Sequence, residues 1–153
     1  MRAAVDTGAL VALANPRDQY HDAARRAARG FLDRGGRFVG TTLVLAELHG
    51  HLLRRMPAGA AAAVLRAVTM DRAYDWRDAT TDMVDSALND WMGRFQDQGF
   101  SLTDAVTFEL MRRERLTDAF AFDDHFRVAG FGLLSPRSDF VGHVAILEQY
   151  AGQ

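Results

Sequence analysis

The sequence contains neither cysteine nor lysine, and the two absences exclude whole classes of chemistry. Without cysteine the chain has no disulfide bond, no thiolate nucleophile and no cysteine zinc site, which agrees with a reducing compartment. Without lysine it has no Walker A loop and no Schiff-base lysine. All 18 basic residues are therefore arginine. The planar fork of arginine suits phosphate oxygens, although all-arginine usage also follows from a GC-rich genome.

Long apolar runs are missing as well. No stretch approaches the ~20 residues that a membrane-spanning helix needs, and Asp6 comes too early for the first residues to be a secretion signal. We therefore expect a cytoplasmic protein with no membrane association. Because the net charge is −2, nucleic acid would have to be bound by a local basic surface or through metal ions.

What the sequence does contain is ordinary for one folded domain. Its 153 residues are 48% hydrophobic and 25% charged, far from the composition of a disordered chain. This length is enough to bury a core without disulfide bonds or a structural metal. We predict a single domain over 1–135, followed by a helical extension over 136–153 that packs on the same domain. Asp139 is the expected cap of the helix over 138–153.

Short apolar runs alternate with segments of helical periodicity. Strands are predicted over 3–5, 37–40, 74–76, 119–122 and 131–134. Helices are predicted over 9–14, about 20–34, 58–68, about 80–96, 101–115 and 123–129. One more helix is expected to begin with Thr41 or Thr42 as its cap and to break at Pro57. Strands separated by helices pair in parallel through right-handed crossovers, so we predict an α/β fold with a parallel sheet sandwiched between helices. In such sheets ligands bind beyond the carboxyl ends of the strands.

Two acids stand where that edge of the sheet is expected. Asp6 follows the first strand directly, which opens it to a ligand, although an acid there also caps helices. Glu47 lies among apolar residues of a predicted helix. An uncompensated charge in such a position is costly, so Glu47 must be protonated, pair with arginine, or face a metal or cleft. The alternative is a glutamate on the solvent face of that helix.

Three further acids occur in the second half of the chain. Asp104 stands three residues after Ser101, the spacing of a capping box, and the helix dipole favours an acid there whether or not it binds a ligand. Asp123 and Asp124 follow an apolar strand. We expect Asp123, the nearer to the strand, to point into the ligand crevice, and Asp124 either to cap the next turn or to take no part in the site.

Together these acids favour a metal site more strongly than any one of them. Two end strands and two begin or line helices at the same edge of the sheet, and converging carboxylates repel one another unless a cation neutralises them. Ligation by oxygen alone favours Mg²⁺ or Mn²⁺ over zinc or copper. Such a cluster suits phosphoryl chemistry, in which metal polarises a phosphodiester and activates water.

Four segments of the chain resemble, in order and spacing, the acidic motifs of PIN domains, especially those of VapC-type toxins. They are Val5-Asp6-Thr7-Gly8-Ala9-Leu10, Leu45-Ala46-Glu47-Leu48, Ser101-Leu102-Thr103-Asp104-Ala105 and Ala121-Phe122-Asp123-Asp124-His125-Phe126. The resemblance covers about residues 1–135 and implies a PIN-like fold. It also implies catalytic roles for Asp6, Glu47, Asp104 and Asp123, with the three aspartates as metal ligands, and that Thr7 holds a metal-bound water.

The resemblance further implies a function and partners. It implies an endoribonuclease that leaves a 5′-phosphate and a 3′-hydroxyl, acts as the toxin of a toxin–antitoxin pair, forms a homodimer and is bound by a small antitoxin protein. Whether one or two metal ions act stays open. The chain departs from the family at Ala121, where Thr or Ser is usual, so Asp124 is an alternative to Asp123 as the fourth acid.

Two other functions fit parts of the sequence. A phosphatase of the haloacid-dehalogenase type would use Asp6 as nucleophile, but it needs a second acid where this chain has Gly8, and a later lysine that is missing. A non-catalytic PIN-like module that binds RNA or protein is the other alternative, favoured by Ala121 and opposed by the intact acids. His125 is interpreted as a solvated or packing histidine, with contact to substrate phosphate as the alternative.

Overall fold

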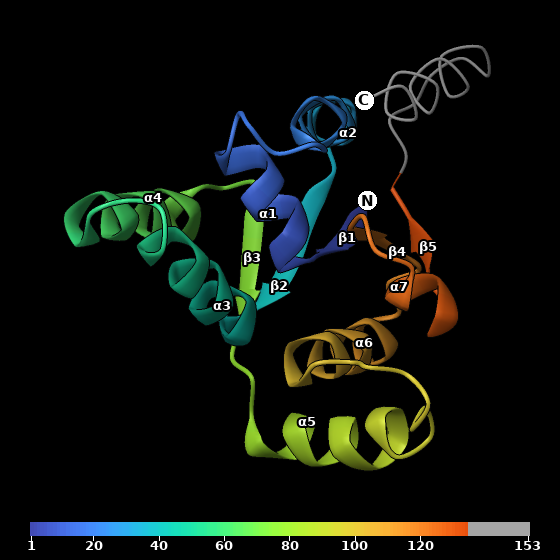
Figure 1. Cartoon of the computed structure of the whole chain (residues 1–153). Coiled ribbons are helices and arrows are strands. Elements are labelled where there is room, and N and C mark those ends of the chain that lie inside the picture. The colour runs from blue at the N-terminus through green and yellow to red at the C-terminus, as the bar shows by residue number, and fades with distance from the viewer. Residues whose placement is uncertain (135–153) are drawn as a thin grey trace.

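Five parallel strands form one sheet through the middle of the structure (Figure 1). The computed structural model describes residues 1–134, so the extension expected over 136–153, with its helix, lies outside the described residues. The strands are β1 (Arg2–Val5), β2 (Arg37–Thr41), β3 (Tyr74–Arg77), β4 (Asp118–Phe120) and β5 (Gly132–Leu133). Their order is β3-β2-β1-β4-β5, and each neighbouring pair is parallel. The predicted parallel α/β sheet is confirmed.

The order of the strands reverses at β1. The chain continues from β1 to β2 and β3 on one side, whereas β4 and β5 lie on the other. The carboxyl ends of β1 and β4 therefore border the position at which open α/β sheets bind ligands. Val5 pairs with Phe120, and the Asp6 amide donates a 3.0 Å hydrogen bond to the Phe120 carbonyl. These contacts hold the two strand ends in register.

Helices cover both faces of this sheet (Figure 1). They are α1 (Thr7–Ala14), α2 (His21–Asp33), α3 (Thr42–Leu53), α4 (Ala58–Met70), α5 (Thr81–Ser86), η1 (Ala87–Met92), α6 (Leu102–Glu114) and α7 (His125–Val128). Buried residues of α1 to α4 form one hydrophobic core and those of α5, η1, α6 and α7 form another. Within residues 1–134 no helix is long and apolar enough to cross a membrane.

The strands are apolar on both faces because they serve both cores. Along β1, Ala3 and Val5 belong to the first core and Ala4 to the second, and along β2 Phe38 and Val39 divide in the same way. All five side chains are fully buried. Such continuous apolar runs are typical of parallel strands covered by helices on both sides.

The helix expected over about 80–96 is partly π-helical in the structure, and it ends earlier than expected. Here α5 continues into η1, a π-helical turn, and helix ends at Met92 rather than Gln96. The Gly93 amide donates to the Leu88 carbonyl, five residues back, at 2.9 Å. Trp91 in this turn donates from Nε1 to Glu109 on α6. We attribute the change of winding to this tertiary contact, which overrides the local α-helical pattern.

One predicted strand end was also wrong. β4 ends at Phe120 rather than Phe122, because β5 is short and pairs only with Asp118 and Ala119. α3 begins at Thr42 with Thr41 at the N-cap position, as predicted, but Thr41 makes no capping hydrogen bond with its hydroxyl. Thr41 is fully buried at the end of β2, and the Thr42 hydroxyl accepts a hydrogen bond from the Ala79 amide instead.

A buried carboxylate joins α6 to η1. Glu109 is fully buried and accepts hydrogen bonds from the Trp91 ring, from Arg112 and from Arg113. Burial alone would raise the pKa of the Glu109 carboxyl, but these donors lower it to about 2. The group is therefore charged and fully partnered, which is the condition under which a buried charge is tolerated.

Candidate metal centre

Asp6 is the first residue after β1, at the carboxyl edge of the sheet. Only 7% of it is exposed. It occupies the N-cap position of α1, yet its side chain makes no capping hydrogen bond. The Asp6 side chain lines a cavity of about 510 Å³, while the amide of Gly8 in the first turn of α1 acts to lower the pKa of its carboxyl.

Asp104 is placed by the first turn of α6. The Ser101 hydroxyl accepts a hydrogen bond from the Asp104 amide, and Asp104 Oδ2 accepts one from the Ser101 amide, both at 3.1 Å. The capping box expected from the sequence is thus present. The Asp104 side chain is 13% exposed. Its position is fixed by the helix end, and the cap leaves Oδ1 available for another contact.

Asp123 and His125 come from the turn between β4 and α7. The His125 amide donates to Asp123 Oδ1 at 3.0 Å, and His125 Nδ1 lies 3.3 Å from Asp104 Oδ2. One potential ligand atom from each of Asp104, Asp123 and His125 lies within 4.8 Å of the others. The last two motifs of the sequence therefore meet in one group that is suited to a metal ion.

The charges of the predicted acids act on Asp6. Burial and, in decreasing order, the negative charges of Asp123, Asp104 and Glu47 together raise the pKa of the Asp6 carboxyl to about 7. The Gly8 amide opposes only part of the shift. The pKa of Asp123 is also raised, first by burial and then by Asp104. Such repulsion is what a bound cation would relieve.

Glu47, on α3, places a further negative charge near Asp6. Its side chain is half-buried, and no ion pair within residues 1–134 involves it, so of the alternatives left open by the sequence the pairing with arginine is absent there. Its charge nevertheless raises the pKa of Asp6. Glu47 is therefore close enough to act on the site electrostatically, although it is outside the tight group of Asp104, Asp123 and His125.

Two threonine hydroxyls at this edge are buried without a hydrogen-bond partner. They are Thr7 Oγ1, next to Asp6, and Thr41 Oγ1, at the end of β2. A buried hydroxyl without a partner is unfavourable, so such groups indicate a missing ligand, ion or water. Carboxylate and hydroxyl oxygens are the donors that hard divalent cations prefer. The residues present fit a divalent metal ion.

Asp124 does not belong to the group formed by Asp104, Asp123 and His125. Its side chain is 80% exposed and forms an ion pair with Arg127 at 3.2 Å. It occupies the N-cap position of α7 but makes no capping hydrogen bond, whereas the neighbouring Asp123 accepts from the His125 amide. Of the two roles expected for Asp124, the cap is absent, because Asp123 Oδ1 accepts from the His125 amide.

Several residues of the site were not predicted from the sequence. His125 was interpreted as a solvated or packing side chain, and it does pack edge-on against Phe100, but it also contacts Asp104. The cavity that Asp6 and Asp123 line is completed by side chains that include Tyr20 and Arg55. No local motif marks these two residues, because their proximity to the acids arises only in the folded chain.

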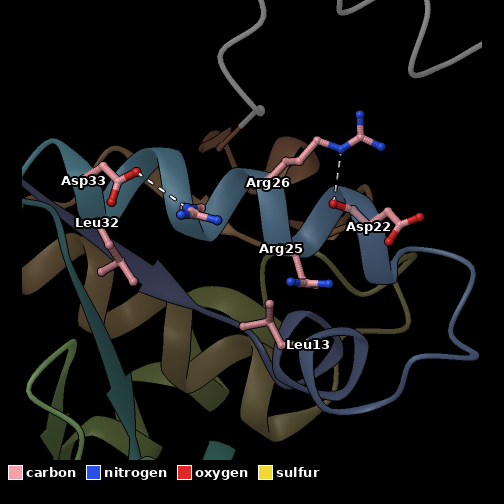
Figure 2. Close-up of a pocket in the computed structure, with 7 residues that line it drawn as sticks. Leu13, Asp22, Arg25, Arg26, Leu32 and Asp33 are labelled. Atoms are coloured by element: carbon pink, nitrogen blue, oxygen red, sulfur yellow. Dashed lines mark hydrogen bonds and ion pairs between the residues drawn. The ribbon is translucent and has the colours of Figure 1, made fainter.

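A second hollow lies beside α2 and has a different character (Figure 2). Leu13 and Leu32 line it together with arginines of α2. Two of these arginines make local contacts, since Arg26 Nε donates to the Asp22 carbonyl and Arg29 pairs with Asp33. No group of converging carboxylates lies there among the described residues. The first cavity is the candidate site.

Comparison with known sequences agrees with the resemblance to VapC-type toxins. The chain is 32% identical over 134 residues to the 23S rRNA-specific endonuclease VapC20 of Mycobacterium tuberculosis, found in two strains of that organism. The match covers 86% of this chain and 97% of VapC20. No protein-family model matches the chain.

Solved structures agree with the fold. The crystal structure of M. tuberculosis VapC20, a sarcin-ricin loop cleaving toxin, superposes with a TM-score of 0.73 at 30% identity and covers 84% of this chain and 95% of that one. VapBC2 from Rickettsia felis, bound to a DNA fragment from its promoter, superposes with a TM-score of 0.65 at 13% identity. The match covers 87% of this chain and 97% of that one. A toxin–antitoxin complex from Klebsiella pneumoniae superposes with a TM-score of 0.56 at 14% identity, and the match covers 89% of this chain and 98% of that one. The last two show the fold alone.

The electrostatics of Asp6 predict a pH-dependent gain in stability on neutralisation. The folded-state pKa of about 7 lies above the ordinary 3.8, so ionisation of Asp6 destabilises the folded state as pH rises between these values. In chelator, Asp6→Asn should raise Tm by several degrees at about pH 8 and by much less at about pH 5. Thermal melts at both pH values measure this, with the exposed Asp33→Asn as control. Equal changes at both pH values would contradict the prediction.

Proposed function

Because the chain belongs to the VapC family of PIN-domain toxins, we propose that it is a metal-dependent endoribonuclease that hydrolyses RNA phosphodiester bonds. The observation that carries the proposal is the gathering of carboxylates at the β1–β4 edge, where the charges of Asp123, Asp104 and Glu47 act on the buried Asp6. A divalent cation would neutralise this cluster, and phosphoryl chemistry is what such a site serves best.

RNA is the proposed substrate, and the cytoplasm is the proposed place of action. The relative at 32% identity acts on 23S rRNA, so we propose 23S rRNA as the first RNA to assay. The carboxylates would act at a phosphate, which is the same at every nucleotide and carries no sequence information. The choice of cleavage position must therefore come from side chains around the site.

We propose Asp6, Asp104 and Asp123 as ligands of Mg²⁺ or Mn²⁺, with Glu47 as the fourth catalytic acid. An all-oxygen donor set favours these ions. When bound, the ion supplies Lewis-acid polarisation of the phosphodiester and lowers the pKa of water. The family resemblance implies products with a 5′-phosphate and a 3′-hydroxyl.

The protein's own residues hold the acids in place. The capping box fixes Asp104 at the start of α6, and His125 Nδ1 contacts its Oδ2. The His125 amide holds Asp123 Oδ1. The buried Thr7 hydroxyl adds an unpartnered oxygen beside Asp6. His125 is thus a positioning residue for two of the acids.

An antitoxin protein is the proposed partner. The Klebsiella pneumoniae neighbour is a toxin–antitoxin complex. Clustered carboxylates form a favourable site for an inserted arginine or lysine, because charge-assisted hydrogen bonds to carboxylates are strong. We propose that the antitoxin inhibits in this way, displacing metal and blocking substrate, and that the nuclease itself is a homodimer.

Cleavage should depend on the metal and on the carboxylates. Asp6→Asn and Asp104→Asn should each reduce turnover of 23S rRNA by roughly 100-fold or more, since each removes a charge that holds the cation. Chelator should abolish the activity of the wild type, and Mg²⁺ or Mn²⁺ should restore it. Gel-based cleavage rates measure the effect, with Asp33→Asn as the control. Full activity in both site variants would refute the assignment.

The adjacent acids should differ in importance. Asp123 lies within the Asp104–His125 group, whereas Asp124 is exposed and paired with Arg127. Asp123→Asn should therefore lose at least roughly tenfold more activity than Asp124→Asn, measured under the same conditions as above. The opposite order would mean that Asp124 is the fourth acid.

Expression without the partner should be toxic. Wild-type chain produced alone should arrest the growth of its host, because the proposed substrate is required for translation, whereas Asp6→Asn should be tolerated. Growth curves after induction measure this, and immunoblots check that both proteins accumulate equally. Harmless wild-type protein that still cleaves RNA in vitro would favour a housekeeping nuclease over a toxin.

A further inference from the structure

Thr41 carries a hydroxyl that the fold buries without a partner. The residue ends β2 and is fully buried, and its Oγ1 has no hydrogen-bond partner within residues 1–134. Such a hydroxyl loses its hydration on folding and gains no bond in return, so groups of this kind are rare in folded proteins. The Thr41 hydroxyl therefore indicates a partner that the described part of the chain does not itself supply.

The register of the sheet sets Thr41 beside Asp6. β1 and β2 are parallel neighbours in the middle of the sheet (Figure 1), and Ala4 pairs with Val39. Continued along both strands, the same register places Asp6 opposite Thr41. Both residues keep an extended backbone, with φ and ψ of −97° and 151° for Asp6 and of −102° and 162° for Thr41. The neighbourhood of the two strands therefore continues to these two side chains.

The two side chains are also directed to the same face of the sheet. Side chains alternate between the faces along a strand, and Ala4 and Val39 belong to the core formed with α5, η1, α6 and α7. Asp6 and Thr41 follow these residues by one full alternation, so both are directed to the face on which α6 carries Asp104 in its first turn. Thr41 is thus on the side of the sheet where the acids converge.

The Thr41 hydroxyl is not used as a helix cap. Thr41 occupies the N-cap position of α3, where threonine is favoured because its hydroxyl can accept from a backbone amide, yet it makes no such bond. Thr80 and Ser101, at the N-cap positions of α5 and α6, each accept from the amide three residues further on. The chain therefore caps helices with hydroxyls elsewhere, and at Thr41 the hydroxyl stays available to the site.

We propose that Thr41 is a positioning residue of the metal centre, whose hydroxyl donates a hydrogen bond, directly or through one water, to the Asp6 carboxylate when a divalent cation is bound. The inference rests on the proposed metal-dependent function and adds a residue to its site. A carboxylate has two oxygens, so Asp6 can bind a cation with one and accept from Thr41 with the other. Contacts of this kind orient metal ligands and increase the affinity for the metal.

Metal binding tests the inference without RNA. Mn²⁺ is titrated into the chain of 153 residues, and the electron paramagnetic resonance signal of free Mn²⁺ gives Kd. Thr41→Val replaces the hydroxyl with a methyl group and should raise Kd roughly fivefold or more, since it removes a hydrogen bond to a charged acceptor. Thr41→Ser keeps the hydroxyl and should stay within about twofold of the wild type.

Thermal stability gives a second readout, which separates a role at the metal from a role in the fold. In chelator, Thr41→Val should raise Tm by a few degrees, because a methyl group replaces a buried hydroxyl without a partner. With saturating Mn²⁺ this gain should disappear, since only the wild type then forms the bond. Equal changes of Tm in the two conditions would refute the inference.

Thr107 provides the matched control. It is fully buried on α6, but its hydroxyl donates to the Thr103 carbonyl at 2.8 Å, so its partner lies inside the chain. Thr107→Val should leave the Kd for Mn²⁺ unchanged, and its effect on Tm should be the same in chelator and in Mn²⁺. Circular dichroism establishes that all variants are folded.

Cleavage assays distinguish this inference from the nuclease assignment. Thr41→Val should raise the Mn²⁺ concentration for half-maximal cleavage of 23S rRNA by the same factor as Kd, with the rate largely restored at high Mn²⁺. If Thr41→Val binds Mn²⁺ as the wild type does, the role of Thr41 is refuted even when RNA is cleaved. If Mn²⁺ affinity depends on Thr41 but RNA is not cleaved, that role stands and the nuclease function fails. Wild-type protein that binds no Mn²⁺ would refute both.

Discussion

Repulsion among the carboxylates at one edge of a parallel sheet is the constraint on which the site depends. Parallel pairing brings the ends of β1 and β4 together, so the acids that follow them meet whether or not their charges favour it. The pKa of Asp6 is raised first by its burial and then by the charges of these neighbouring acids. The fold tolerates this repulsion because two complete hydrophobic cores, one on each face of the sheet, stabilise the strands that hold these acids.

The site is supported by contacts that also serve the fold. Asp104 caps the start of α6 and belongs to the candidate metal centre with the same carboxyl group, and Asp123 does the same for the turn before α7. His125 links the two. Substitution of these residues therefore affects both structure and chemistry, whereas neutralising Asp6 relieves repulsion without removing a cap. Asp6 is the cleaner position at which to separate the two effects.

The sequence was informative where the signal is local. Strands such as β1 follow from short apolar runs, the capping box follows from the spacing of Ser101 and Asp104, and Asp6 follows from its place after a strand. Contacts between distant segments carry no such signal. The Tyr20–Phe122 stack and the bond from Trp91 to Glu109, which accompanies the π-helical turn, required the folded chain. The missing cap at Thr41 likewise depends on burial that the sequence does not reveal.

The two tryptophans of the chain lie on opposite sides of the sheet. Trp76 packs against the core beneath α1 to α4, and Trp91 belongs to the core beneath α5, η1 and α6. Each layer thus has its own intrinsic fluorophore. The Trp91 indole donates a hydrogen bond to the Glu109 carboxylate, and the Trp76 indole donates one to the Val68 carbonyl. Emission from single-tryptophan proteins would report separately on the two layers, and would show whether both halves of the molecule unfold in one cooperative transition.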